Sequence, residues 1–444
     1  MHEDYNIPEN YYPNEGDIIG NYQIVRELGA GTYGIVFEAK NTATRKSFAL
    51  KMLKLYEIAL DKDRKDIVKR FEMEAETGRI QSSNLVHSHD YGWVKGNPYF
   101  VMDYCPYGDL RKKMNRNLSM DDVHKYALGI LFGLKDLHKH GKVHRDLKPD
   151  NVLIDNNNNA ILTDFGIAGH QNVRMSFNML GKPRQIFGTY AYMPPEQQKP
   201  PNKIVTVLPT TDIFSFAVLL YEMYTNKLPF GPLRNDEDLI NYLKNVKDGK
   251  WKNIQTLRKD IPENWVNLIN KNLNPDYKQR SQSIDEMLKE IGENAFVDKS
   301  YKHLSSTDNI AIKVMQGSRY GYIYQISELL IEQSEGFITL GRDDDDTKND
   351  IHIVEEETCF ISRHHATIEK ISGEVDGWFI LDGQWNKDEH KWKLSKNGTF
   401  INGIQANSEE RIALKPNDII TFGDTTLKVI LQNNINIDSR FFKT

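Results

Sequence analysis

Hydrophobic and polar positions follow three successive patterns along the chain. Residues 22–58 alternate apolar and polar side chains, which predicts β-strands, and the charged segment 62–80 has the periodicity of an amphipathic helix. From about residue 110 to 265 the apolar residues recur at helical spacing. A polar stretch begins near residue 296, and short strands return after it. The patterns predict an α+β protein with a β-rich lobe, a mostly helical lobe and a separate all-β domain.

Length, charge and cysteine usage narrow the class of protein. At 444 residues the chain exceeds the ~250–300 residues of a single hydrophobic core, so two domains are expected. The net charge of -5 provides no overall attraction to nucleic acid or to an anionic membrane, so neither is expected as a partner. Only Cys105 and Cys359 are present, and neither a signal peptide nor a long apolar run is visible. These features predict a cytoplasmic protein.

A glycine-rich turn and a downstream lysine raise the question of phosphate binding. Glycines in the stretch from Gly29 to Val36 would let backbone amides approach phosphate oxygens, although a hairpin without a ligand explains this pattern equally well. Lys51 follows in a predicted strand, where it could hold phosphates or simply be exposed. The next helix offers Glu74 as its counter-ion, with Glu72 and Glu76 as competitors.

Two later motifs favour phosphoryl transfer. The stretch 143–151 supplies Asp146 to orient an attacking hydroxyl, Lys148 for the transferring phosphate and Asn151 as an amide ligand for Mg²⁺. Asp164 follows an apolar strand and begins an Asp-Phe-Gly turn, which places a second Mg²⁺ ligand near the first.

With these motifs in order, residues 22 to about 290 resemble the eukaryotic-type (Hanks-type) serine/threonine protein kinases. The resemblance implies a bilobal fold, ATP with Mg²⁺ or Mn²⁺ as cofactors, and catalysis by Asp146, Lys148 and Lys51. Lys148 places the chain in the serine/threonine branch rather than the tyrosine branch. The residues implied for the nucleotide are Gly29, Ala30, Gly31, Gly34, Val36, Ala49, Lys51, Glu74, Met102, Asp103 and Tyr104, and those implied for the metal are Asn151 and Asp164.

The same resemblance identifies an activation segment that ends at Glu196. Thr189 lies near its end, Asp212 begins a buried helix, and Arg280 is expected to pair with Glu196. Pro194 replaces the usual alanine of the closing motif, and Ala217 stands where a glycine is common, both away from the chemistry. Between residues 167 and 188 the only hydroxyl side chain is Ser176. We therefore hypothesise that a regulatory phosphate would be carried by Ser176 and bound by Arg145.

The C-terminal part carries a second set of motifs, around Arg342, Ser362 and Asn397. Loops at one end of a β-sandwich can hold a guanidinium, a hydroxyl and an amide around one phosphate. Across about 312–430 the motifs resemble a forkhead-associated domain, which implies phosphothreonine binding. Arg363 and Lys396 would add positive charge, while His365, Gly398, Thr399 and Asn402 would hold the loops in shape. A metal site at the His364-His365 pair is disfavoured because no further Cys or His ligands lie nearby.

Two departures from the forkhead-associated pattern lie beside these motifs. The stretch 383–394 lengthens the connection before Asn397, and the acidic run 343–346 adjoins Arg342. The acidic run could weaken phosphate binding, could select peptides with basic residues beside the phosphothreonine, or could be a solvated loop.

The sequence thus predicts a kinase joined to a phosphothreonine reader. The predicted parts are an N-terminal extension at 1–21, a kinase domain at 22–295, a linker at 296–311, a reader domain at 312–432 and a tail at 433–444. Expected partners are proteins with substrate serine or threonine, phosphothreonine proteins, and further copies of the chain through autophosphorylation. A pseudokinase scaffold that docks phosphoproteins is the alternative, against which the intact Lys51, Asp146, Asn151 and Asp164 argue.

Overall fold

A computed structural model describes most of the chain. The described residues are 8–31, 34–58, 61–165, 190–198, 208–292, 304–305, 308–317, 319, 321–332, 336–342, 347–354, 360–372, 376–386, 390–406 and 410–431. The chain forms two compact units. One contains residues 1–136, 144–193 and 214–273, and the other contains residues 137–143, 194–213 and 274–444.

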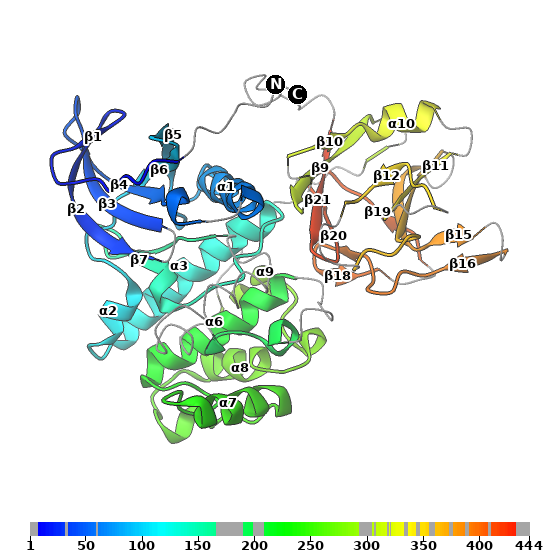
Figure 1. Ribbon diagram of the computed structural model, residues 1–444. Coiled ribbons are helices and arrows are strands. Elements are labelled where there is room, and N and C mark those ends of the chain that lie inside the picture. Colours follow the sequence, from blue (N-terminus) through cyan, green and yellow to red (C-terminus); the bar gives the residue numbers. More distant parts are fainter. Residues whose placement is uncertain are drawn as a thin grey trace. The chain divides into compact units, whose positions relative to one another are not determined.

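The first lobe is an antiparallel sheet of six strands with one helix beside it (Figure 1). In sheet order the strands are β1 (Ile18–Ile19), β2 (Tyr22–Ala30), β3 (Gly34–Asn41), β4 (Ser47–Leu53), β6 (Asn97–Asp103) and β5 (Ser88–Val94). Alternate residues of β3 are buried, as the alternating sequence pattern predicts. A short 3₁₀ turn, Leu55–Glu57, leads toward α1 (Asp61–Thr77). The predicted strands and the charged helix are therefore confirmed.

Part of the predicted N-terminal extension packs on this sheet. The Glu9 backbone N–H donates to Lys95 O at 3.0 Å, and Asn97 Nδ2 donates to Glu9 O at 3.0 Å. The Tyr12 hydroxyl donates to Glu27 Oε2 at 2.7 Å. Ile19 in β1 is 1% exposed within the core of the sheet. Residues 8–21 are therefore structurally part of the first lobe, because they contribute both backbone pairing and buried side chains.

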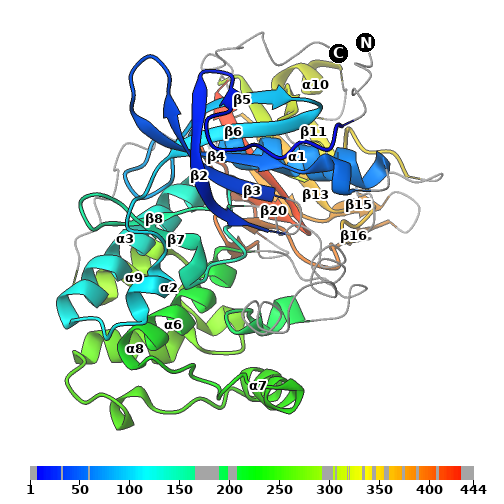
Figure 2. The ribbon, with the colours of Figure 1, turned by 60° about the vertical axis from the view of Figure 1, so that its left-hand side comes forward.

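The next part of the chain is mostly helical, as predicted from its periodicity. Its helices are α2 (Leu110–Met114), α3 (Met120–Lys139), α6 (Pro209–Thr225), α7 (Asp236–Asp248), α8 (Glu263–Asn272) and α9 (Ile284–Glu290). Shorter elements are the 3₁₀ turns at Pro149–Asn151, Pro195–Gln198, Ile254–Thr256 and Tyr277–Gln279, and the hairpin of β7 (Val152–Ile154) with β8 (Ala160–Leu162). Ser119 Oγ accepts from Asp122 N at 3.1 Å and so caps the start of α3. Figure 2 shows the same helices from another side.

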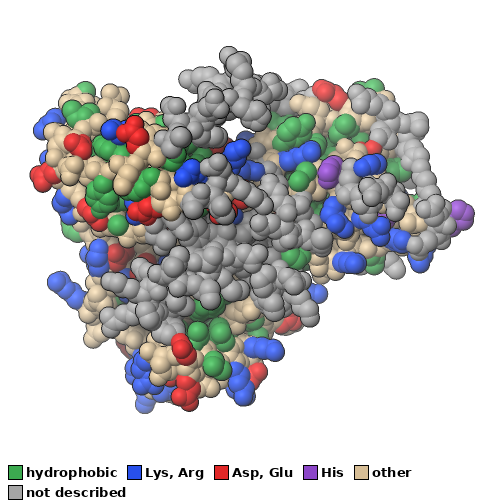
Figure 3. Space-filling model, in the orientation of Figure 1, with side chains coloured by type: hydrophobic (Ala, Val, Ile, Leu, Met, Phe, Trp, Pro, Cys, Tyr) green, Lys and Arg blue, Asp and Glu red, His purple; other side chains and the backbone are tan. Residues whose placement is uncertain are grey.

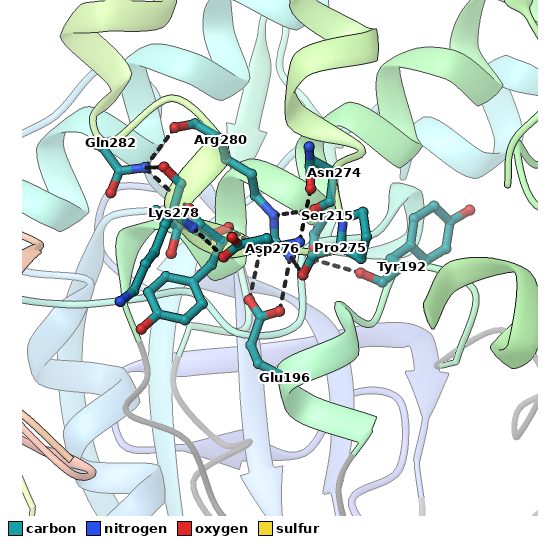
Figure 4. A network of polar contacts seen from close by, with 11 residues as sticks. Tyr192, Glu196, Ser215, Asn274, Pro275, Asp276, Lys278, Arg280 and Gln282 are labelled. Carbon is teal, nitrogen blue, oxygen red and sulfur yellow. Dashed lines mark hydrogen bonds and ion pairs between the residues drawn. The ribbon is translucent and has the colours of Figure 1, made fainter. Parts of the chain in front are cut away.

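The ion pair predicted between Arg280 and Glu196 is present and buried (Figure 4). Arg280 Nη1 and Nη2 donate to the two carboxylate oxygens of Glu196 at 2.7 and 2.9 Å. The remaining donors reach backbone carbonyls, with Nε 2.8 Å from Asn274 O and Nη1 3.0 Å from Thr210 O. The Arg280 side chain is 0% exposed, so its charge is balanced by protein groups rather than by water.

Replacing Arg280 by methionine should lower the free energy of unfolding by about 3–5 kcal/mol, because Glu196 would then be a buried charge without its partner. Differential scanning calorimetry of the full chain measures this loss. Arg234→Met is the matched control, since the Arg234–Asp238 pair lies at the surface, where solvent screens it, and should contribute little to stability. The double variant Arg280→Met/Glu196→Met should recover part of the loss, and equal losses in the single and control variants would contradict the argument.

The C-terminal domain is a sandwich of two sheets around a core that includes Trp378 and Phe422. One sheet has the order β10 (Ile323–Tyr324), β9 (Ile310–Gln316), β21 (Thr425–Leu431), β20 (Ile419–Phe422), β17 (Phe400–Ile401) and β18 (Ile404–Gln405). The other has the order β12 (Ile351–His352), β11 (Phe337–Gly341), β13 (Ala366–Ile371), β14 (Gly377–Asp382) and β19 (Ile412–Ala413). A hairpin of β15 (Gln384–Asn386) and β16 (Lys391–Lys393) stands apart from both.

Two details of this domain differ from the sequence-based expectation. The domain was expected to start at 312, but Leu304 and Ile310 are buried in its core, so it begins within the predicted linker. The expected all-β domain also contains one short helix, α10 (Ile326–Glu332). Within the described parts of the chain, every helix is either too short or too polar to cross a membrane.

Candidate functional site

The glycine-rich turn joins β2 to β3 at the edge of the first lobe. Gly29 pairs with Val36 across the two strands, and Gly31 N donates to Gly34 O at 2.7 Å. A methyl group at Gly29 would meet no atom within 4 Å, so open space lies beside this backbone. In the next strand Lys51 pairs with Val36, and Ala49 lies two residues earlier. Ala30 ends β2, so the predicted nucleotide residues of β2, β3 and β4 share one corner of the sheet.

Lys51 holds two carboxylates together. Its Nζ lies 2.6 Å from Glu74 Oε1 and 2.5 Å from Asp164 Oδ1. The Lys51 and Glu74 side chains are 12% and 3% exposed, whereas the Asp164 side chain is 39% exposed. Of the competing acids, Glu72 accepts from the Tyr91 hydroxyl at 3.2 Å and is exposed. The ion pair predicted for Lys51 is therefore made by Glu74.

Lys51 and Asp164 stabilise each other's charge, whereas burial, with Asp164, raises the pKa of Glu74 to about 8 although Lys51 opposes the shift. Burial alone would lower the pKa of Lys51, but the nearby carboxylates of Asp164 and Glu74 outweigh it and raise that pKa. Burial would likewise raise the pKa of Asp164, but Lys51, with a smaller contribution from Lys148, holds it at about 2. Asp164 is thus an anion and Lys51 a cation at neutral pH.

The catalytic-loop residues form a second cluster around Asp146. Lys148 Nζ lies 2.9 Å from Asp146 Oδ2. Asn151 Nδ2 donates to Asp146 O at 2.8 Å and to Asp146 Oδ2 at 3.2 Å. Asp146 Oδ2 therefore accepts from two side chains, which fixes the orientation of the carboxylate.

The β7–β8 hairpin brings the two clusters together. Val152 pairs with Leu162, and Thr163 N donates to Asn151 O at 3.1 Å. Asn151 and Asp164 consequently leave the hairpin side by side, although they are distant in the sequence. These contacts bring Lys51, Asp146, Asn151 and Asp164 together in one cluster.

Two residues of these motifs have backbones in the left-handed region, which the sequence does not reveal. Arg145 has φ 68° and Asp164 has φ 59°. Such conformations are uncommon outside glycine and cost of order 1–3 kcal/mol, so they persist only where the surrounding structure holds them. Arg145 is 6% exposed, and its burial is one such constraint.

The predicted nucleotide residues Met102, Asp103 and Tyr104 form a hinge segment where β6 ends. Met102 is 6% exposed and pairs with Ala49 across the sheet. Asp103 N donates to His87 O at 3.0 Å, and the Tyr104 hydroxyl accepts from Arg26 Nη2 at 2.9 Å. The Tyr104 side chain is thus engaged on the outside of the lobe, which leaves the backbone as the part of the hinge able to meet a base. Cys105 follows this segment. Burial raises the pKa of its thiol to about 12, so it is neutral.

In the C-terminal sandwich, the predicted phosphopeptide residues lie on neighbouring loops. Arg342 N donates to Ser362 O at 3.1 Å, and Lys396 N donates to Ser362 Oγ at 2.9 Å. Asn397 Nδ2 donates to Phe360 O at 2.7 Å. The loop of Ser362 is therefore bonded directly to the loops that carry Arg342 and Asn397.

Gly341 and Arg363 explain how closely these loops approach. A methyl group on Gly341 would lie 2.2 Å from Arg363 O, which no side chain could tolerate. Asn349 Nδ2 donates to the same carbonyl at 3.0 Å. The Arg363 side chain is exposed. The acidic run 343–346 lies outside the described residues.

Comparison with known proteins settles the family. The profile of the protein kinase domain matches residues 22–291, which is more than half of the chain. The chain belongs to the protein kinase family. The profile of the FHA domain matches residues 338–423. Both resemblances predicted from the motifs are confirmed, and the sandwich is a forkhead-associated (FHA) domain.

Curated relatives are kinases that match this chain over part of their length. A probable serine/threonine-protein kinase of Clostridium acetobutylicum is 31% identical over 280 residues, which cover 62% of this chain and 40% of the relative. Probable serine/threonine-protein kinase PknB of Lactococcus lactis is 28% identical over 300 residues, 66% of this chain and 45% of the relative. CBL-interacting protein kinase 5 of Oryza sativa is 28% identical over 259 residues, 58% and 53% respectively. The chain thus matches about half or less of each relative.

Membership of the kinase family implies ATP and a divalent metal ion, and the clustered residues suit a nucleotide and a metal ion. Asn151 donates through its Nδ2, so its Oδ1 is the atom left to serve as a ligand. Asp164 adds an anionic carboxylate that is 39% exposed. Carboxylate and amide oxygens are the ligands that Mg²⁺ prefers, and this ion usually keeps waters and substrate phosphates as its other ligands.

The activation segment of the kinase domain is described only at its end, so Ser176 and Thr189 lie outside the described residues. Just after Thr189, the Tyr192 hydroxyl accepts from Arg111 Nη2 at 2.5 Å and donates to Glu222. Arg111 Nη1 also donates to Glu222 Oε1 at 2.7 Å. This cluster ties the end of the segment to α2 and α6. No local sequence pattern links the three side chains, so this cluster could not be predicted from the sequence.

His365 of the FHA domain is a buried structural residue. Its Nδ1 accepts from Ser362 N at 3.0 Å, and its Nε2 lies 3.3 Å from Gly398 O. This arrangement requires a neutral ring. Burial lowers the pKa of His365 to about 4, although Asp382 and Gly398 oppose the shift. Among the residues that the structure describes, no group of three or more His, Cys, Asp or Glu side chains could hold a metal ion.

The FHA domain should lose stability as the pH falls from about 6.5 to about 4. In that pH window the imidazole of His365 binds a proton in the unfolded chain but not in the folded domain. The free energy of unfolding therefore falls by up to about 3 kcal/mol. Amide hydrogen exchange of β13 and β14 in the full chain measures the effect. His365→Gln should flatten the pH dependence, whereas His390→Gln, at an exposed site, should leave it unchanged. The same slope in both variants would contradict this assignment.

Proposed function

We propose that the protein is an ATP-dependent serine/threonine protein kinase whose FHA domain binds phosphothreonine on substrates, on partners or on other copies of the chain. The observation that carries the proposal is the grouping of Lys51, Asp146, Asn151 and Asp164 through direct contacts. Kinase-family membership and the names of the relatives support the same reaction. Lys148 favours serine and threonine as acceptors.

Each side chain of the clustered site has its own role in this mechanism. The Asp146 carboxylate, which Lys148 and Asn151 orient, accepts the proton of the substrate hydroxyl. Lys148, beside that carboxylate, offsets charge on the phosphoryl group as it moves. Lys51 is fixed by Glu74 and orients the phosphates of the nucleotide.

The nucleotide and metal would be held by residues already described. Asn151 Oδ1 and the Asp164 carboxylate would hold the divalent ion, and the Gly29–Gly34 turn would cover the phosphates. When bound, the ion neutralises charge on the phosphates. Met102 and the hinge backbone at Asp103 and Tyr104 would bound the adenine.

In the FHA domain, Arg342 would supply a guanidinium fork, and Ser362 and Asn397 would complete the phosphate pocket. Arg363 and Lys396 would add positive charge at its rim. A reader joined to a kinase raises the local concentration of phosphorylated substrate near the active site. A pseudokinase scaffold is less well supported, since Lys51, Asp146, Asn151 and Asp164 are all present and lie close together.

The deciding measurement is transfer of labelled phosphate from [γ-³²P]ATP and Mg²⁺ to a protein rich in serine and threonine. The proposal expects label on phosphoserine or phosphothreonine that requires Asp146. A scaffold would give no label dependent on that carboxylate, and label on tyrosine alone would overturn the assigned acceptor. Phosphothreonine-peptide binding by the same full chain tests the reader separately.

A further inference from the structure

The β15–β16 hairpin presents lysines on one face and tryptophans on the other. Gln384 lies opposite Lys393, Trp385 opposite Trp392, and Asn386 opposite Lys391. Directly opposed residues of an antiparallel pair project to the same side, and successive residues alternate. Lys391 and Lys393 therefore share the face of Gln384. We call these two lysines the basic hairpin face.

Gln384 anchors that face to the loops of the phosphate pocket. Its Nε2 donates to Leu340 O at 2.9 Å and to Asn349 Oδ1 at 2.8 Å. Its Oε1 lies 2.9 Å from His364 Nδ1. Leu340 and His364 are close neighbours in sequence of Arg342 and Arg363. The hairpin thus leaves the domain beside the phosphate pocket, with its lysines on the pocket side of the pleat.

The hairpin is held rigidly at its other strand as well. Trp392 Nε1 donates to Asp382 O at 2.8 Å, and a methyl group on Gly383 would lie 2.1 Å from Lys393 O. Beyond β16 the chain returns to the pocket, where Lys396 N bonds to Ser362 Oγ. A surface held in this way loses little freedom when a ligand binds.

Positive charge gathers along this edge. Figure 3 shows Lys and Arg side chains together over β15 and β16. Lys391, Lys396 and Arg363 are exposed, and the segment 383–396 holds four lysines against two acidic residues. The carboxylate of Asp382, at the base of the hairpin, is buried and accepts from Ser395 and Thr399. It therefore offers no opposing surface charge.

We propose that the basic hairpin face binds a second anionic group on the same peptide that places phosphothreonine in the Arg342 pocket. The group is a carboxylate or a second phosphate, separated from the phosphothreonine by a few residues. This inference rests on the proposed reader function and adds a selectivity for acidic or doubly phosphorylated ligands. It explains why the chain lengthens this connection with lysines rather than with neutral loop residues.

A peptide fits this surface better than a nucleic acid does. The lysines adjoin one phosphate pocket lined by a guanidinium, a hydroxyl and an amide, whereas nucleic-acid surfaces present basic tracts along many phosphates. The acidic run 343–346 directly follows Arg342 in the sequence. It can favour peptides that carry a basic residue at a different position from the acidic group. The two preferences are separated by scanning the position of the charge.

The test measures fluorescence anisotropy of the full chain with labelled peptides. One peptide carries phosphothreonine with neutral flanks, and others add aspartate or phosphoserine at successive positions on either side. At the best position the wild type should bind about fivefold more tightly than to the neutral peptide. Lys391→Gln/Lys393→Gln should bring that ratio near one without changing affinity for the neutral peptide. Lys391→Arg/Lys393→Arg should preserve the ratio.

Lys370→Gln/Lys415→Gln is the matched control, because Lys370 pairs with Trp378 at the end of β13 opposite the pocket, and Lys415 lies beyond β19 at the same end. An unchanged ratio in the Lys391/Lys393 double glutamine variant overturns the proposal. Loss of DNA-oligonucleotide binding in that variant, with the peptide ratio intact, overturns it in favour of nucleic acid. Failure of the wild type to bind any phosphothreonine peptide instead refutes the reader function itself.

Discussion

Replacing Asp146 by asparagine should lower the kcat of phosphoryl transfer by about two to four orders of magnitude. Asparagine keeps the shape of the side chain and can still accept a hydrogen bond, but it cannot take the proton of the substrate hydroxyl. Steady-state transfer of labelled phosphate to a serine-containing substrate, at saturating Mg²⁺ and ATP, measures the loss.

Two further measurements make that result specific to chemistry. Affinity for a fluorescent ATP analogue should change by less than about threefold, because Lys51 and Asp164 hold each other independently of Asp146. Asp121→Asn is the matched control, since Asp121 is an exposed acid in the first turn of α3. Activity within a factor of about two of the wild type in Asp146→Asn would remove Asp146 from the mechanism and restore the scaffold alternative.

The clustered site residues could be predicted from the sequence because they belong to short motifs that occur in a fixed order. The alternation before Lys51, the periodicity around Glu74 and the apolar strand before Asp164 each predict the element that positions the side chain. The choice of Glu74 over Glu72 and Glu76 rested on the family resemblance, because Glu74 lies three residues beyond Phe71, as in similar sequences. The structure adds the distances that turn these separate motifs into one site.

Other features depend on contacts between distant residues and left no local signal. The left-handed backbone of Arg145 arises from the surrounding fold, not from its residue type. The link from Arg111 to Tyr192 and Glu222 joins three regions of the chain. The 8–21 segment read as a polar extension, because the pairing of Ile18 and Ile19 with β2 is too short to give a periodic pattern.

The lengthened connection at 383–394 illustrates the same limit in the FHA domain. Its lysines, acids and tryptophans alternate too irregularly to predict a hairpin, and it read only as a departure from the family pattern. The register of β15 with β16 places Lys391 and Lys393 on the same side as Gln384, and Gln384 bonds to Leu340 O. The positions of the lysine charges therefore follow from the strand pairing and not from the sequence alone.

The second large effect is expected in the reader. Arg342→Ala should weaken phosphothreonine-peptide binding by about 30-fold or more, since truncating one member of a hydrogen-bonded charge pair costs about 2–5 kcal/mol. Arg342→Lys should recover only part of the loss, because an ammonium keeps the charge but lacks the planar fork that matches two phosphate oxygens. Isothermal titration calorimetry of the full chain with one phosphothreonine peptide compares the variants.

Arg411→Ala is the control for a lost arginine in the same domain, because its exposed side chain pairs with Glu369 away from the pocket. The melting temperature should be the same in Arg342→Ala and wild type, because the backbone N–H of Arg342, which the substitution keeps, makes the bond to Ser362 O. If Arg342→Ala bound the phosphopeptide as tightly as Arg411→Ala does, the phosphate would have to be held elsewhere. The basic hairpin face would then be the first place to look, and its lysine variants would report on the phosphothreonine itself.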